Sequence, residues 1–138
     1  MTTYLLRKSI AAFILLGVLA VTSSFLCAGQ SVFNVKDYGA TGVKSDDGRA
    51  AIQKAIEACA KAGGGMVYLP PGEYTSGTLV LRSHVRLHIE AGATLFASPD
   101  PAAYEYGKIP SKAALLYGED VENISIEGRG TVDGQAEY

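Results

Sequence analysis

The spacing of apolar side chains predicts one amphipathic helix in the first half of the chain. Ile52, Ala55, Ile56 and Cys59 recur at intervals of three and four residues, which places them on one helical face. The preceding "SDD" (45–47) can accept hydrogen bonds from the free first-turn amides, and three glycines at 63–65 end the pattern. Its paired aspartates also invite a reading as metal ligands or acid–base catalysts, but their place directly before a helix favours capping.

After this helix the pattern changes to short β segments, most of them separated by glycine or proline. The stretch 85–90 alternates strictly, with apolar residues on one face and Arg86, His88 and Glu90 on the other. Further strands are expected at 66–69, 78–81, 94–97, 114–117, 123–127 and 131–132, and a first short strand at 32–35. Many short strands indicate either a β-sandwich or a β-solenoid.

An internal repeat favours the solenoid. "LHIEAGATL" (87–95) matches "ISIEGRGTV" (124–132) at an offset of 37 residues, and "GTLVL" (77–81) is a shorter third echo. Repeated strand–turn–strand units are typical of solenoids, in which each unit buries its apolar face against its neighbours. The long interval includes the proline-bounded stretch "SPDPAAYEYGKIPS" (98–111), which resembles an insertion. The sequence therefore predicts a right-handed parallel β-helix.

The first 29 residues have the pattern of a secretory signal peptide. Arg7 and Lys8 precede an apolar run of twelve residues (10–21), and small residues follow, with cleavage expected after Ala28 or Gly29. Twelve residues are short for a membrane anchor, and Leu26 before Cys27 disfavours lipidation. We expect a secreted, extracellular or periplasmic protein without stable membrane association.

Charge and cysteine content narrow the function. Residues 30–138 keep ten basic and fourteen acidic side chains, a balance that argues against a nucleic-acid partner but allows a local basic groove for an acidic polysaccharide. Cys59 alone cannot form an internal disulfide, and its apolar neighbours indicate a buried residue. No Cys/His spacing resembles a zinc site, and on a strand His84 and His88 would lie about 13 Å apart, too far for one metal ion.

The order of these segments resembles the N-terminal part of the polygalacturonases, glycoside hydrolase family 28, within the pectate-lyase-like β-helix superfamily. The matching stretches are "FNVKDYGATG", "DDGRAAIQKAIEACAKAGGGMVYLPPGEYTSGTLVLRSHVRLHIEAGATL" and "GRGTVDGQ". The resemblance implies an all-β solenoid, a right-handed parallel β-helix with an N-terminal capping α-helix. Residues 30–138 would form the cap and the first coils of an incomplete domain.

The same resemblance implies inverting hydrolysis of α-1,4-galacturonan by two carboxylates, without a cofactor or metal and in a monomer when the protein is full length. The family's later "NTD", "DD", "GHG" and "RIK" motifs are absent, so no catalytic residue is assigned and the chemistry is expected C-terminal to Tyr138. Residues 30–138 alone are expected to be inactive. A β-helix lyase or epimerase, or a non-catalytic polysaccharide-binding module, remains the alternative.

Three groups of residues have a functional and a structural interpretation. Asp133 at a strand end could be a catalytic acid, although Asp before Gly is typical of a structural turn. Outward-facing basic residues could contact a polyuronate or form a solvated face; they are Arg82, His84, Arg86 and His88. Tyrosines 104, 106 and 117 could stack on sugar rings or pack within the fold.

Overall fold

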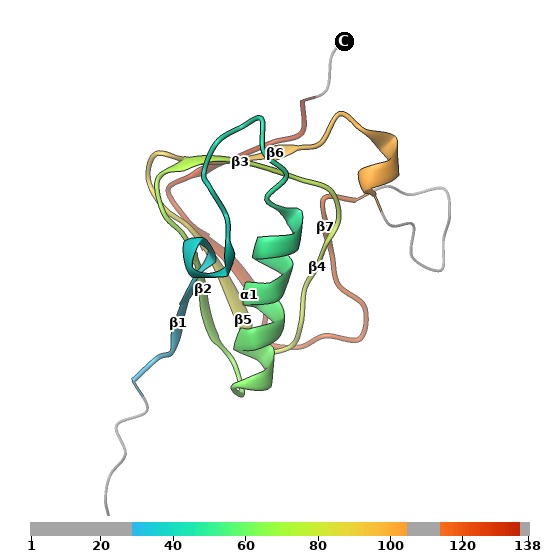
Figure 1. Ribbon diagram of the computed structural model, residues 1–138. Coiled ribbons are helices and arrows are strands. Elements are labelled where there is room, and N and C mark those ends of the chain that lie inside the picture. Colours follow the sequence, from blue (N-terminus) through green and yellow to red (C-terminus); the bar gives the residue numbers. More distant parts are fainter. Residues whose placement is uncertain (1–28, 105–113, 136–138) are drawn as a thin grey trace, which may run out of the picture.

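A computed structural model describes residues 29–104 and 114–135 (Figure 1). Its helices are η1 (Val35–Tyr38), α1 (Arg49–Lys61) and η2 (Pro101–Ala103). Its strands are β1 (Val32–Asn34), β2 (Gly65–Leu69), β3 (Gly72–Ser76), β4 (Leu79–Val80), β5 (Val85–Ile89), β6 (Ala93–Ala97), β7 (Leu116–Tyr117), β8 (Ser125–Gly128) and β9 (Thr131–Asp133).

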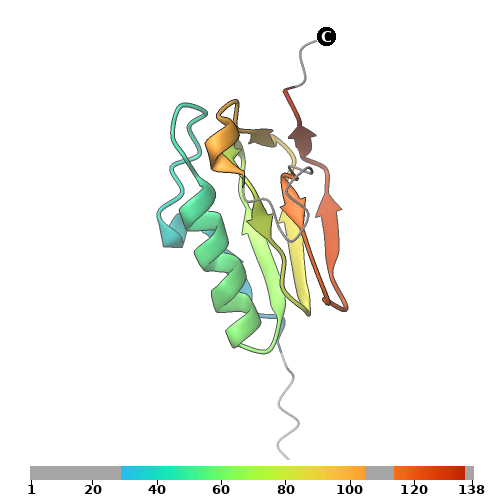
Figure 2. The ribbon, with the colours of Figure 1, turned by 90° about the vertical axis from the view of Figure 1, so that its right-hand side faces the viewer.

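The strands form three sheets, and every strand pair is parallel. The sheet orders are β1-β2-β5-β8, β3-β6-β9 and β4-β7. The chain therefore visits the three sheets in turn and then starts again one layer further on, so that each round is one coil. Figure 2 shows these layers stacked side by side, from α1 at one end to β8 and β9 at the other. The predicted parallel β-helix is confirmed.

Residues in register between coils build the core. Val67 pairs with Leu87 and Tyr74 pairs with Leu95, and all four side chains are at most 1% exposed. Outward positions on the same strands stay partly accessible, because successive side chains in a strand point to opposite faces. The strict alternation predicted for 85–90 is observed over β5.

The predicted capping helix closes one end of this core. α1 packs against η1, β1, β2, β4 and β5, and the four apolar residues of its predicted face are all completely buried. Asp47 Oδ1 accepts a hydrogen bond from Arg49 N at 2.9 Å, which makes Asp47 the side chain that satisfies the start of the helix. Ser45 and Asp46, the other two predicted capping residues, bond elsewhere in the loop.

Each of β2, β3 and β4 has a partner on the side that faces the helix. β1 pairs with β2, and the loop before α1 pairs with β3 through Gly48 N to Thr75 O (2.8 Å). Gln53 on α1 pairs with β4, because its amide donates to Val80 O (3.1 Å) and accepts from Val80 N (2.9 Å). An open strand edge invites pairing with another chain, so this end of the solenoid is protected.

The internal repeat predicts the right register for β9 on β6, but the register it predicts for β8 on β5 is two residues off. Leu95 pairs with Val132 as the echo predicts, but Leu87 pairs with Ile126 instead of Ile124. Ile89 pairs with Gly128 and Thr94 pairs with Thr131, so the connection between these paired positions is two residues shorter after β8 than after β5. Gly128 makes this possible, since its φ is +117° and a Cβ there would lie 2.0 Å from the carbonyl oxygen of Ile89.

Two further expectations are corrected. Residues 77–81 do not repeat the echo, because β4 lies in a different sheet and pairs with β7. Residues 72–76, where no strand is expected from the sequence, form β3. The two prolines before them end β2, and the alternation Gly-Glu-Tyr-Thr-Ser buries Tyr74 and Ser76. No helix among the described residues is long and apolar enough to cross a membrane. Residues 1–28 of the predicted signal peptide, which include Cys27, and Tyr106 lie outside the described residues.

Candidate functional site

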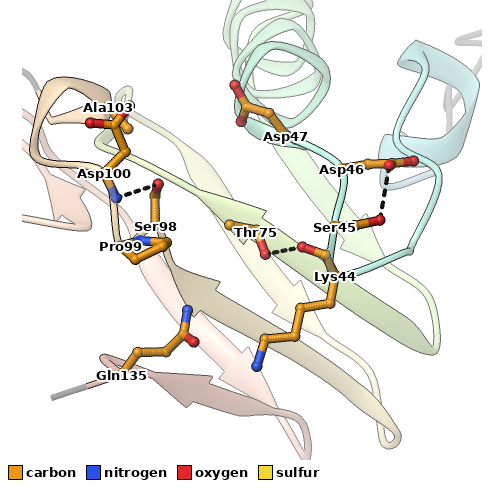
Figure 3. A pocket seen from close by; sticks show the side chains of 10 residues that line it. All are labelled: Lys44, Ser45, Asp46, Asp47, Thr75, Ser98, Pro99, Asp100, Ala103 and Gln135. Atoms are coloured by element: carbon orange, nitrogen blue, oxygen red, sulfur yellow. Dashed lines mark hydrogen bonds between the residues drawn. The ribbon is translucent and has the colours of Figure 1, made fainter. Parts of the chain in front are cut away.

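A polar pocket lies where three strands end and the loop before α1 crosses them (Figure 3). Its volume is about 410 Å³. The chain reaches it at the carboxyl ends of β3 and β6, just after β9, and in the loop of residues 44–47. Parallel strands bring their carboxyl ends to one edge, so residues far apart in sequence meet there. The lining consists of Lys44, Ser45, Asp46, Asp47, Thr75, Ser98, Pro99, Asp100, Ala103 and Gln135.

The three carboxylates of this pocket have structural partners. Asp47 accepts from the first amide of α1, as described above. Asp46 accepts from the hydroxyls of Thr41 (2.8 Å) and Ser45 (3.2 Å). Asp100 Oδ1 accepts from Ala102 N at 2.9 Å and so begins η2. Each carboxylate therefore helps to shape a loop, and of the acidic pair Asp47 fits the capping interpretation whereas Asp46 does not.

Lys44 and Gln135 are the two lining side chains whose polar groups are most available to a ligand. The Lys44 ammonium lies 3.9 Å from the ring centroid of Phe96, and Thr75 Oγ1 donates to the Lys44 carbonyl at 2.6 Å. The Gln135 amide nitrogen donates to Ala97 O, which leaves its oxygen as an acceptor. Both side chains extend into the pocket in Figure 3. The arrangement suits a polyhydroxylated ligand, and no nucleophile–base pair is formed by these lining residues.

Sequence reasoning missed Lys44, Ser98 and Gln135. The available signal was their position in the chain. Ser98 and Gln135 follow the ends of strands, and Lys44 lies in a loop beside one; parallel strands bring such positions together. Because the sequence pattern predicts no strand at 72–76, it does not predict the shared edge of β3, β6 and β9. Tertiary stacking, and not any local motif, creates this pocket.

Asp133 is a structural residue of the turn after β9. Its Oδ1 accepts from Gln135 N at 2.8 Å, and Gln135 has a left-handed backbone with φ +49°. A carboxylate that bonds the amide two residues ahead stabilises such a turn. The geometry agrees with the structural interpretation of "VDGQ".

The predicted row of four basic residues is broken. β5 begins at Val85, so His84 lies in the preceding turn, with φ +64°. His88 on β5 lies between two glutamates, with its ring nitrogens 3.6 Å from Glu90 and 3.6 Å from Glu127. Arg86 also projects from the outer face of β5, whereas Arg82 precedes the turn and is exposed. Of the four, Arg86 and His84 both line a cavity described below.

The outer face of β5 carries a polar cluster that includes Tyr68. Its ring stacks on that of His88 with centroids 5.8 Å apart, and its hydroxyl donates to Glu90 Oε2 at 3.3 Å. Burial and the adjacent Glu90 raise the pKa of Tyr68. Glu90 has a lowered pKa, chiefly because Ala91 N donates to Oε1 at 2.8 Å. Among the described residues, no group of three His, Cys, Asp or Glu side chains is placed to hold a metal ion.

The remaining candidates have structural environments. Cys59 is completely buried, and burial raises the pKa of its thiol. Tyr104 donates to Ser98 O at 2.6 Å, and Tyr117 donates to Glu119 at 2.7 Å. Both hydroxyls thus have a partner within the fold, which favours packing over sugar stacking.

Comparison with known proteins agrees with the class of fold. The chain is a right-handed parallel β-helix, the fold of its structural relatives. Residues 32–95 match a family model described as rhamnogalacturonase A/epimerase, pectate lyase-like. This match lies over the cap and the first coils, from β1 into β6.

Particular relatives fall into two kinds of enzyme. The chain is 40% identical to a mannuronan C5-epimerase of Azotobacter vinelandii over 74% of its own length and 12% of that protein. It is 35% identical to an exo-poly-α-D-galacturonosidase of Dickeya chrysanthemi over 78% of its length and 20% of that protein. Its structure resembles an exopolygalacturonase of Thermotoga maritima, with a TM-score of 0.72 and 31% identity over 78% of this chain and 26% of that one. The chain thus spans a fifth or less of these two sequence relatives.

Proposed function

We propose that these residues are the N-terminal part of an exported, polygalacturonase-like glycoside hydrolase that cleaves α-1,4-galacturonan or a related pectic chain. Relatives of both kinds act, by their names, on chains of uronic acids, which supports an acidic polysaccharide as the substrate. The proposed catalysis is inverting hydrolysis, in which one carboxylic acid protonates the leaving oxygen and one carboxylate activates water.

The observation that carries the hydrolase proposal is that the structure is more similar to two exopolygalacturonases than to two mannuronan epimerase modules. Two exopolygalacturonases align with TM-scores of 0.72 and 0.69 over 78% and 77% of this chain. Two mannuronan epimerase modules align with 0.59 and 0.58 over 75% and 76%. Coverage is almost the same, so the path of these first coils is closer to that of the two exopolygalacturonases than to that of the two epimerase modules. The higher sequence identity to an epimerase keeps epimerisation as the second candidate.

The described carboxylates support a catalytic centre elsewhere in the full-length protein. Asp46, Asp47, Asp100 and Asp133 each accept a hydrogen bond that shapes a loop or turn. We therefore expect both catalytic carboxylates C-terminal to Tyr138, and the capping helix and first coils to serve as the scaffold on which later coils stack.

Exposed apolar side chains in the last described coil support this role. Ile126 and Val132 continue the buried rows of Leu87 and Leu95, yet they are 50% and 47% exposed. β7, β8 and β9 are also edge strands in the described part. A further coil stacked on them would bury the apolar rows and pair the edges, as α1 and its loop do at the other end.

The test is to incubate the full-length protein that carries this chain with polygalacturonate, with and without a chelator. A hydrolase releases reducing ends in both conditions and forms no product that absorbs in the near ultraviolet. A lyase would give that absorbance, and an epimerase would change the sugar configuration in the NMR spectrum of polymannuronate without cleaving it. Either of these results would overturn the hydrolase proposal. Residues 30–138 expressed alone should release no reducing ends.

A further inference from the structure

A second cavity, of about 490 Å³, lies on a different sheet from the Lys44 pocket. It is found where β2 and β5 begin, beside the loop between α1 and β2. The lining residues are Gly29, Gln30, Ser31, Ala62, Gly63, Gly64, Gly65, His84, Arg86 and Asn123. None of the described lining residues is a carboxylate, in contrast to the Lys44 pocket with its three aspartates; Glu122 lies beside the lining, with Oε1 3.5 Å from His84 Nε2.

Arg86 is the charged residue of this cavity, and its charge has no counterpart. The side chain is half-buried on the outer face of β5 and makes no hydrogen bond or ion pair with any described residue. Its Nη2 atom is buried without a partner. A guanidinium that loses water without gaining a hydrogen bond costs free energy, so such a group in a folded protein needs an explanation.

His84 and Asn123 are held beside Arg86 by a strained turn. Both have left-handed backbones, with φ of +64° and +53°, and His84 N donates to Glu122 O at 2.9 Å. Asn123 Nδ2 lies 3.1 Å from His84 Nδ1, and His84 Nε2 lies 3.5 Å from Glu122 Oε1, so both ring nitrogens face a partner within this turn. Non-glycine residues in this region cost free energy and persist where the surroundings fix them. The ring of His84 is therefore held at the cavity by contacts between residues of two successive coils.

We propose that this cavity binds a carboxylate of an acidic polysaccharide chain, with Arg86 as the charge partner and the ring of His84 as a flanking contact. The nature of the ligand rests on the proposed function; the need for an anion rests on Arg86. The guanidinium pairs with carboxylates through two parallel hydrogen bonds, and its charge is delocalised. An anion at its accessible edge therefore compensates the charge of the whole group. The site would hold the polymer on a sheet other than the one that carries the Lys44 pocket.

Binding of the full-length protein to immobilised polygalacturonate tests the proposal, with neutral galactan as the polymer control. Arg86→Gln should raise the dissociation constant for polygalacturonate about tenfold, the effect expected for a charge-assisted pair. The matched control Arg82→Gln removes an equal charge from an exposed residue that lines neither cavity, and it should leave the constant within about twofold. Added salt should reduce the difference between wild type and Arg86→Gln.

His84→Asn is the second variant, because asparagine tolerates the left-handed backbone of this turn. It should weaken binding by about threefold while the melting temperature stays near that of the wild type. If Arg86→Gln does not fold, the binding of His84→Asn decides whether the proposal stands. Equal binding by wild type, Arg86→Gln and His84→Asn would overturn the proposal, as would equal binding to galactan. Arg86-dependent binding without any hydrolysis would support this site while the proposed enzymatic function fails.

Discussion

Leu95 and Val132 are paired neighbours in one apolar row of the β-helix, but Leu95 is completely buried and Val132 is 47% exposed. Their surroundings differ because Leu95 lies between two coils, whereas Val132 lies in the last described coil. The same contrast separates Leu87 from Ile126. The row itself is therefore continuous, and its burial depends on what stacks next.

This contrast predicts the effect of trimming three valines in the full-length protein. Val67→Ala removes a fully buried side chain and should cost about 1–3 kcal/mol. Val132→Ala should cost a similar amount if a further coil covers it. Val43, 53% exposed in a loop, is the matched control, and its change to alanine should cost less than about 0.5 kcal/mol. Urea unfolding measures all three. A Val132→Ala cost equal to that of Val43→Ala would show that no coil covers this row.

Gly128 should not tolerate substitution by a residue with a side chain. Its φ of +117° and the 2.0 Å approach of a Cβ to Ile89 O mean that Gly128→Ala forces the two coils apart. We expect destabilisation of about 2 kcal/mol or more. Gly134 has nothing within 4 Å of a Cβ, so Gly134→Ala should change the free energy of unfolding by less than about 0.5 kcal/mol. Similar thermal unfolding of the two variants would contradict the tight turn seen here.

Gln53 should stabilise the protein through the edge of β4. Gln53→Ala leaves both Val80 N and Val80 O without their partner, which we expect to cost about 1–3 kcal/mol. Lys54, the next residue of α1, is exposed, and Lys54→Ala should be nearly neutral. Hydrogen exchange at the Val80 amide gives a local measurement: exchange should accelerate in Gln53→Ala and not in Lys54→Ala. Unchanged protection would mean that this pairing does not protect the edge.

Asp133 offers a direct test of structural against catalytic roles. Asp133→Asn keeps an Oδ1 acceptor for Gln135 N but removes the carboxylate, so hydrolysis of polygalacturonate should stay within about twofold of wild type. Asp133→Ala removes the acceptor and should lower the free energy of unfolding by about 1 kcal/mol. A fall in activity of a hundredfold or more in a folded Asp133→Asn would make this residue catalytic.

Glu90 should make stability depend on acid pH. Its pKa is lowered from the ordinary 4.5, chiefly by the hydrogen bond from Ala91 N, and Tyr68 and His88 add to the effect. A carboxyl with a lower pKa in the folded state stabilises the protein above pH 4.5, and this contribution is lost as the pH falls through the folded value. Glu90→Gln should flatten the stability profile in that window, and Tyr68→Phe should flatten it less. Unchanged urea midpoints across the window in both variants would contradict this assignment.

The sequence by itself determined the elements that depend on local pattern. The spacing of Ile52 and Cys59 gave the capping helix its buried face, and the alternation over 85–90 gave β5 its two faces. Residue type and spacing decide such features, since helix and strand periods are local properties. The repeat of 37 residues was enough to favour a solenoid.

Only the tertiary structure decided how the coils meet. The register of Leu87 on Ile126 depends on Gly128 fitting beneath Ile89, and the strand Gly72–Ser76 is stabilised by the loop on one side and β6 on the other. Lys44, Gln135 and Ser98 meet because parallel strands end at one edge, and Arg86 lacks a counter-charge because of what surrounds it in space. These relationships join residues up to about ninety positions apart, and no local pattern encodes such distances.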